Sequence, residues 1–97
     1  MDIKEVKYLM KQCFEYKVVK IPEGFTVEIQ FLGKPYPLEV DAMINATTMF
    51  ALDIKMENFI QQEAEQVMLD LRGGYSNGFA NHLIKAMQKY SMELASK

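Results

Sequence analysis

The stretch FTVEIQFLGKPYPLEVDAMINATTMFALDIKM, residues 25–56, contains three runs in which apolar and polar residues alternate. The runs cover residues 25–32, 38–44 and 50–56, and short breaks rich in Gly, Pro, Asn or Thr separate them. Side chains on a β-strand point to opposite faces with a period of two, so each run can bury one face and leave the other in water. The sequence therefore predicts an antiparallel meander.

The third run has a second interpretation, because apolar residues from it also fall on one helical stripe. The stripe comprises Met49, Leu52, Met56, Phe59, Ala64, Val67 and Leu71. A single helix over residues 47–71 would then replace a strand followed by a helix. Ile54 fits the strand and not the helix, and the two threonines before the run also favour a strand. We therefore expect a strand at 50–56 and a helix over 57–71, with the long helix as the alternative.

The residues before this stretch predict a helix and an edge strand. Asp2 can cap a first helix. The apolar stripe of this helix comprises Ile3, Val6, Leu9, Met10, Cys13 and Phe14. Residues 16–21 are aromatic or β-branched, apart from two lysines, and predict a short strand. Lys17 and Lys20 suit a sheet edge, where charged side chains oppose unwanted strand pairing.

The C-terminal part predicts two helices joined by a short link. Glycine favours the left-handed conformation that ends helices, so Gly73 and Gly74 should stop the helix over 57–71. Ser76 or Asn77 can cap the last helix. Its expected stripe is Phe79, Leu83, Ala86, Met87, Tyr90 and Leu94. The predicted fold is therefore α+β: an N-terminal helix, a three- or four-stranded antiparallel meander, and a C-terminal helical hairpin packed on one sheet face.

Composition limits the classes of function. The 97 residues suit a single domain, 1–97, and 49% of them are hydrophobic, including eight Met. One Cys excludes an internal disulfide, and one Cys with one His cannot supply a zinc site of soft ligands. We expect no metal and no cofactor. The first residues lack an apolar signal core, and no run reaches about 20 apolar residues, so a cytoplasmic location without a membrane partner is expected.

The net charge of −2 hides a segregation of sign along the chain. Residues 1–22 carry five Lys against three acidic residues, a balance of +2. Residues 23–71 carry two Lys against nine acidic residues (−7), and residues 72–97 carry four basic residues against one (+3). A protein that binds phosphate backbones by general attraction presents a clear basic excess, so a nucleic-acid partner is not favoured.

The best candidate for a ligand site is the Gly-rich loop before the last helix. It consists of Arg72, Gly73, Gly74, Tyr75, Ser76 and Asn77, and His82 follows within the helix. Free backbone N–H groups at a helix start attract anions, Arg72 can pair with a phosphate, and Tyr75 can stack on a base. Helix capping alone requires the same residue types, and the loop lacks the Lys-Ser/Thr ending of a phosphate-binding loop.

The sequence favours a binding protein over an enzyme. His82 has no recognisable nucleophile or orienting acid in its sequence context, so no catalytic residue is assigned. The first hypothesis is a small adaptor, inhibitor or assembly factor that acts through a protein-interaction surface, with self-association as a homodimer or other homo-oligomer included. The second is a binder of a nucleotide or other phosphate at residues 72–82. A nucleic-acid module with basic ends is the third.

Overall fold

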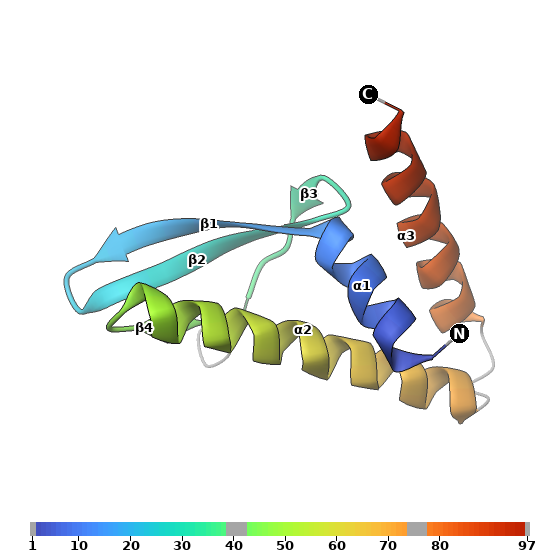
Figure 1. Cartoon of the computed structure of the whole chain (residues 1–97), viewed down its shortest axis with the longest axis horizontal. Helices are drawn as coiled ribbons and strands as arrows, with labels where there is room; N and C mark the ends of the chain where they lie inside the picture. Colours follow the sequence, from blue (N-terminus) through green and yellow to red (C-terminus); the bar gives the residue numbers. More distant parts are fainter. Residues whose placement is uncertain (1, 39–42, 74–77, 97) are drawn as a thin grey trace.

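The computed structural model describes residues 2–38, 43–73 and 78–96 of the chain (Figure 1). An antiparallel sheet lies at one end, the first and last helices lie at the other, and the long middle helix runs along the sheet toward them. Along the chain the elements are α1 (Ile3–Cys13), β1 (Phe14–Ile21), β2 (Gly24–Phe31), β3 (Lys34–Pro35), β4 (Asn45–Ala46), α2 (Met49–Arg72) and α3 (Phe79–Ala95). The predicted α+β class is confirmed, as are the N-terminal helix and the antiparallel sheet.

The first helix forms as its sequence predicts. The Asp2 carboxylate accepts a hydrogen bond of 2.9 Å from the Glu5 backbone N–H, which satisfies one of the free donors at the start of α1. The buried side of α1 consists of Val6, Leu9, Met10 and Cys13. Phe14 continues directly into β1, so one turn-free junction ties helix and sheet together.

The sheet is built on the β1–β2 hairpin. A two-residue turn at Pro22 and Glu23 joins the strands, and their register runs from Ile21 opposite Gly24 to Phe14 opposite Phe31. The other edge of β2 pairs with β3 at one end and with β4 at the other, both antiparallel. The predicted edge strand at 16–21 is part of β1, and the strand predicted at 25–32 is β2.

The second predicted strand, at 38–44, falls mainly on residues 39–42, which lie outside the described residues. The flanking residues Leu38, Met43 and Ile44 are described, and none of them belongs to a strand. On this side of β2, the described pairing is limited to the two short strands β3 and β4.

The strand predicted at 50–56 is wrong, and the alternative long helix is correct. Residues 49–72 form α2, whose first turn is capped by a 3.1 Å hydrogen bond from the Ala51 N–H to the Thr48 hydroxyl. Its buried stripe is Leu52, Met56, Ile60, Ala64 and Val67. Leu52 and Met56 satisfy both periodicities, so they make the helix resemble a strand in the sequence. The capping threonine and the continuation of the stripe over four further turns decide for the helix.

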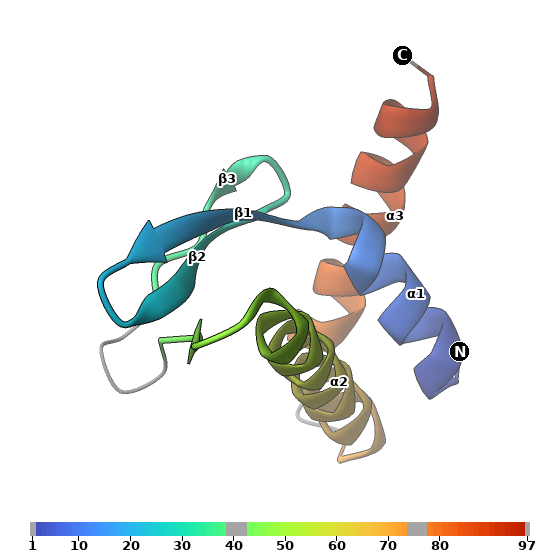
Figure 2. The same cartoon turned by 60° about the vertical axis from the view of Figure 1, so that its left-hand side comes forward.

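The two C-terminal helices pack on α1. The first half of α2 lies along the sheet near β4 and β2, and its later part crosses α1 (Figure 1). Turned by 60°, the molecule shows α2 foreshortened, with the sheet on one side and α1 and α3 on the other (Figure 2). Helix α3 also packs against α1, and the Cys13 thiol donates a hydrogen bond of 3.5 Å to the Met87 carbonyl of α3.

The caps and the buried side of α3 differ from the sequence-based expectation. The N-cap of α3 is Gly78, at φ 63° in the left-handed region, and not Ser76 or Asn77. The buried residues are Ala80, Ile84 and Met87, with Leu83 and Tyr90 partly buried beside them. Phe79 and Ala86 are exposed instead, so the stripe is rotated by about one residue. Small Ala80 permits close packing there, which a search for large apolar residues overlooks.

The junction of α1 and β1 carries an aromatic cluster centred on Phe14. The ring of Phe14 lies 4.4 Å from that of Phe31, 5.5 Å from Tyr36 and 5.4 Å from Phe59, measured between centroids. These rings join helix, sheet and α2 in one core. Burial raises the pKa of Tyr36, and the charge of Glu63 adds to the effect; burial also raises the pKa of the Glu63 carboxyl.

Candidate interaction surface

The loop predicted to bind phosphate is only partly described. Gly74, Tyr75, Ser76 and Asn77 lie outside the described residues. Arg72 is the last residue of α2, and Gly73 caps the helix with φ −72°, so the left-handed cap is not at Gly73. Arg72 lines a hollow of about 290 Å³ together with Ile3, Glu65, Met68 and Leu69. The Glu65 carboxylate in this hollow opposes the binding of an anion beside Arg72.

The structure does not bring His82 into the hollow lined by Arg72. His82 is exposed in α3, where its backbone N–H donates a 2.8 Å hydrogen bond to the Gly78 carbonyl. This bond belongs to the ordinary start of a helix and involves no side-chain atom. Phosphate binding at residues 72–82 therefore stays a prediction.

The described residues contain few groups arranged for chemistry. Within residues 2–38, 43–73 and 78–96, no three His, Cys, Asp or Glu side chains are grouped so as to hold a metal ion. No helix in this part of the chain is long and apolar enough to cross a bilayer. The thiol of Cys13 is buried, and burial raises its pKa to about 11. Since the thiolate is the nucleophilic form, Cys13 is held in its unreactive state at neutral pH.

We expect Cys13 to react with a thiol reagent only when the protein unfolds. The raised pKa also makes the folded state lose stability as pH increases. Between the unfolded value of 9.0 and about 11, the unfolded thiol is ionised while the folded thiol keeps its proton, so unfolding is favoured increasingly across this window. Ellman's reagent in native and denaturing buffer, with melting temperatures across this pH range, tests both points. Rapid labelling of the native protein at pH 7 would contradict the buried position.

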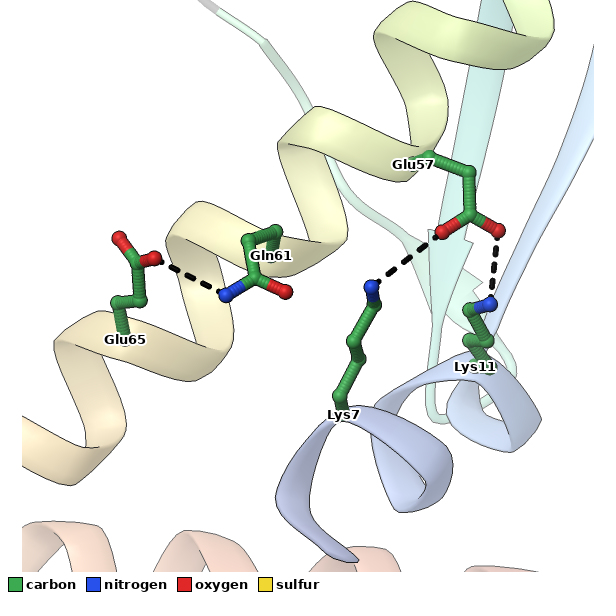
Figure 3. Close-up of polar contacts among 5 residues, drawn as sticks. All are labelled: Lys7, Lys11, Glu57, Gln61 and Glu65. Atoms are coloured by element: carbon green, nitrogen blue, oxygen red, sulfur yellow. Dashed lines mark hydrogen bonds and ion pairs between the residues drawn. The ribbon is translucent and has the colours of Figure 1, made fainter. Parts of the chain in front are cut away.

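A set of polar contacts fixes α2 against α1 and β1. The Tyr16 hydroxyl donates a 3.0 Å hydrogen bond to the Asp53 carboxylate, and this bond is the main cause of the raised pKa of Tyr16. The Glu57 carboxylate pairs with Lys11 at 2.7 Å and with Lys7 at 3.6 Å (Figure 3). The hydrogen bond from Lys11 is the largest cause of the lowered pKa of Glu57. One side of α2 therefore faces α1 and the outer strand of the sheet.

The outer edge of β1 has backbone groups without a strand partner among the described residues. β1 is the first strand in the sheet order, and within residues 2–38, 43–73 and 78–96 it pairs only with β2. The Leu32 N–H donates to the Cys13 carbonyl, and Ile21 closes a two-residue turn, so odd-numbered residues of β1 bond to β2. The N–H and C=O groups of Tyr16, Val18 and Lys20 therefore point away from the sheet.

A large aromatic side chain is exposed on the same side of the molecule. Phe50 in α2 is 77% exposed, and Ile54, one turn further on, is 46% exposed. Phe50, Asp53 and Glu57 are spaced by three and four residues and share one helix face. Asp53 and Glu57 contact β1 and α1, so Phe50 also lies on the side of α2 toward the outer edge of β1.

We call the combination of this strand edge and helix face the edge surface. It consists of Tyr16, Val18 and Lys20 from β1 and of Phe50, Asp53 and Ile54 from α2. Sequence reasoning missed it because the alternation at 50–56 assigned Phe50 and Ile54 to a buried strand face. The signal that could have found it is Thr48, a capping residue directly before the helical stripe of α2.

Comparison with known protein families, with curated protein sequences and with solved structures finds no match for the chain.

Proposed function

We propose that this protein is a small cytoplasmic binding protein, an adaptor, inhibitor or assembly factor without catalysis of its own, and that it binds through the edge surface. The observation that carries the proposal is the position of Phe50, 77% exposed, beside the edge of β1 that no other described strand covers. A single reduced cysteine in the core is compatible with a cytoplasmic location, where thiols stay reduced.

Both parts of the edge surface suit protein recognition. An unpaired strand edge offers main-chain hydrogen bonds to any extended segment that adds to the sheet. An exposed aromatic ring beside it supplies apolar contact area with little loss of side-chain entropy, as is typical of residues that dominate protein interfaces. At 77% exposure, Phe50 buries little apolar area within the monomer, so its ring is available to a partner.

Replacing Phe50 with Glu tests the proposal. Tagged wild-type and Phe50→Glu proteins are expressed in the source cells, cross-linked, and their bound proteins are quantified. Phe79→Glu is the matched control, because Phe79 is 66% exposed at the start of α3, away from β1. We expect Phe50→Glu to lose bound proteins by about tenfold or more, and Phe79→Glu to retain them. Equal recovery by both variants, with unchanged melting temperatures, would contradict a role for the edge surface.

A further inference from the structure

We propose that the edge surface binds a second copy of this chain, with the two β1 strands antiparallel about a two-fold axis at Val18. This inference rests on the proposed function, because it uses the same surface and names its partner. It joins the two sheets into one continuous sheet and places the two α2 helices on the same face. Isologous contacts of this kind are the commonest way in which small proteins form closed dimers.

The backbone of β1 selects the register. Antiparallel strands exchange pairs of hydrogen bonds only between residues whose N–H and C=O groups point at one another. The outward residues are Tyr16, Val18 and Lys20, so the axis passes either through one outward position or through an inward residue between two of them. An axis at Val18 pairs Val18 with the partner's Val18. It also pairs Tyr16 with the partner's Lys20, and Lys20 with the partner's Tyr16. All three outward residues then form hydrogen bonds. An axis at Lys17 would instead place Lys20 opposite the partner's Phe14, whose N–H already donates to the Met10 carbonyl, and an axis at Val19 would place Tyr16 opposite the partner's Pro22, which has no N–H.

The side chains agree with this register. Val18, Tyr16 and Lys20 point to the sheet face covered by α2, since they lie opposite Val27, Ile29 and Phe25. Pairing Tyr16 with the partner's Lys20 brings that ammonium group to the Tyr16 ring and to the Asp53 carboxylate, which accepts the Tyr16 hydroxyl at 3.0 Å. The dimer contains two such contacts between opposite charges. Each also allows the cation to lie against an aromatic ring.

Lys20 also discriminates against other strands. On an edge it opposes pairing with a neutral or basic segment, because its ammonium group loses water without gaining a partner. A second copy supplies Asp53 and Tyr16 at the position that Lys20 reaches. This charge complementarity is the reason for taking a second copy as the occupant.

Phe50 lies near the proposed axis. Helix α2 runs beside β1 in the opposite sense, because Asp53 contacts Tyr16 and Glu57 contacts Lys11. Phe50 precedes Asp53 by three residues, which is about 4.5 Å along the helix. A strand advances about 3.3 Å per residue, so Phe50 lies level with Val18 or its neighbour. Two exposed Phe50 rings then approach each other under the joined strands and remove apolar surface from water.

The first measurement is the mass in solution, by light scattering over concentrations up to about 500 µM. Such high concentrations are needed because an interface made of one strand edge and one aromatic side chain binds weakly. We expect the mass to rise from 11.2 kDa toward twice that value. Lys20→Asp and Asp53→Lys should each weaken dimerisation about tenfold or more, and the double variant should restore it because the charges are exchanged. Lys85→Asp on α3 is the control with the same charge change, and it should leave dimerisation unaltered.

The second measurement is amide hydrogen exchange, resolved by residue, on dilute and concentrated protein. The amides of Tyr16, Val18 and Lys20 should gain protection with concentration. Those of Lys17 and Val19 should be protected throughout, because they bond to β2. A dimer formed through another surface would not give this difference between even-numbered and odd-numbered amides of β1.

The inference is overturned if the protein remains a monomer, if Lys20→Asp behaves like Lys85→Asp, or if the alternating protection does not appear. Its failure is separable from failure of the proposed function. A monomeric wild type that loses its cellular partners through Phe50→Glu keeps the function and removes the dimer. If the protein is a dimer and cross-linking recovers only further copies of this chain, the result supports both the proposed function and the dimer.

Discussion

Replacing Gly24 with Ala should destabilise the protein by about 3 to 5 kcal/mol, a large part of the about 5 to 15 kcal/mol that holds a small domain folded. Gly24 has φ +143°, a conformation that residues with a Cβ rarely adopt. A Cβ at this position would also lie 2.3 Å from the Ala46 carbonyl oxygen and 2.8 Å from the Thr47 Cα. The substitution therefore combines backbone strain with a displacement of β4 from the sheet.

Gly33→Ala is the matched control for this prediction. Gly33 also has a positive φ, +77°, but a Cβ there would meet only the Tyr90 ring, at 3.6 Å, an ordinary contact distance. We expect a cost of about 1 to 2 kcal/mol from the backbone alone. Urea unfolding followed by circular dichroism measures both variants. If Gly24→Ala lowers the free energy of unfolding no more than Gly33→Ala does, then β4 does not approach Gly24 as closely as the structure has it.

The parts of the fold that sequence could predict are those with one dominant signal. Asp2 and the stripe of α1 indicate a helix without ambiguity, and the alternation from Phe25 to Phe31 indicates a strand. The helix α2 carries two signals at its start, since Leu52 and Met56 fit both periods. The role of Gly24 is also hidden in sequence: it reads as part of a turn, whereas β4 approaches it from a distant segment.

The candidate surface was less predictable than the fold. Its exposed aromatic residue, Phe50, changes from buried to exposed when residues 50–56 change from strand to helix. The hydrogen bond between Tyr16 and Asp53 joins residues far apart in sequence, so no local pattern indicates it. Lys17 and Lys20 predict the edge position of β1, which is the component of the edge surface that the sequence indicates.

The start of α2 yields a prediction in which two neighbouring substitutions have very different effects. Leu52 is fully buried in the core, and Ile54 is 46% exposed. Leu52→Ala leaves a cavity among packed side chains and should cost about 3 to 5 kcal/mol. Ile54→Ala removes a partly exposed side chain and introduces a stronger helix former, so its cost should stay below about 1 kcal/mol.

A strand at 50–56 would predict a different result, because residues 52 and 54 are both even-numbered and would share one buried face. Both substitutions would then be severe. Urea unfolding at concentrations where each variant is monomeric separates the free energy of folding from any contribution of the edge surface. A cost for Ile54→Ala as large as that for Leu52→Ala would restore the strand, bury Phe50 on the same face, and remove the exposed ring on which the proposed binding depends.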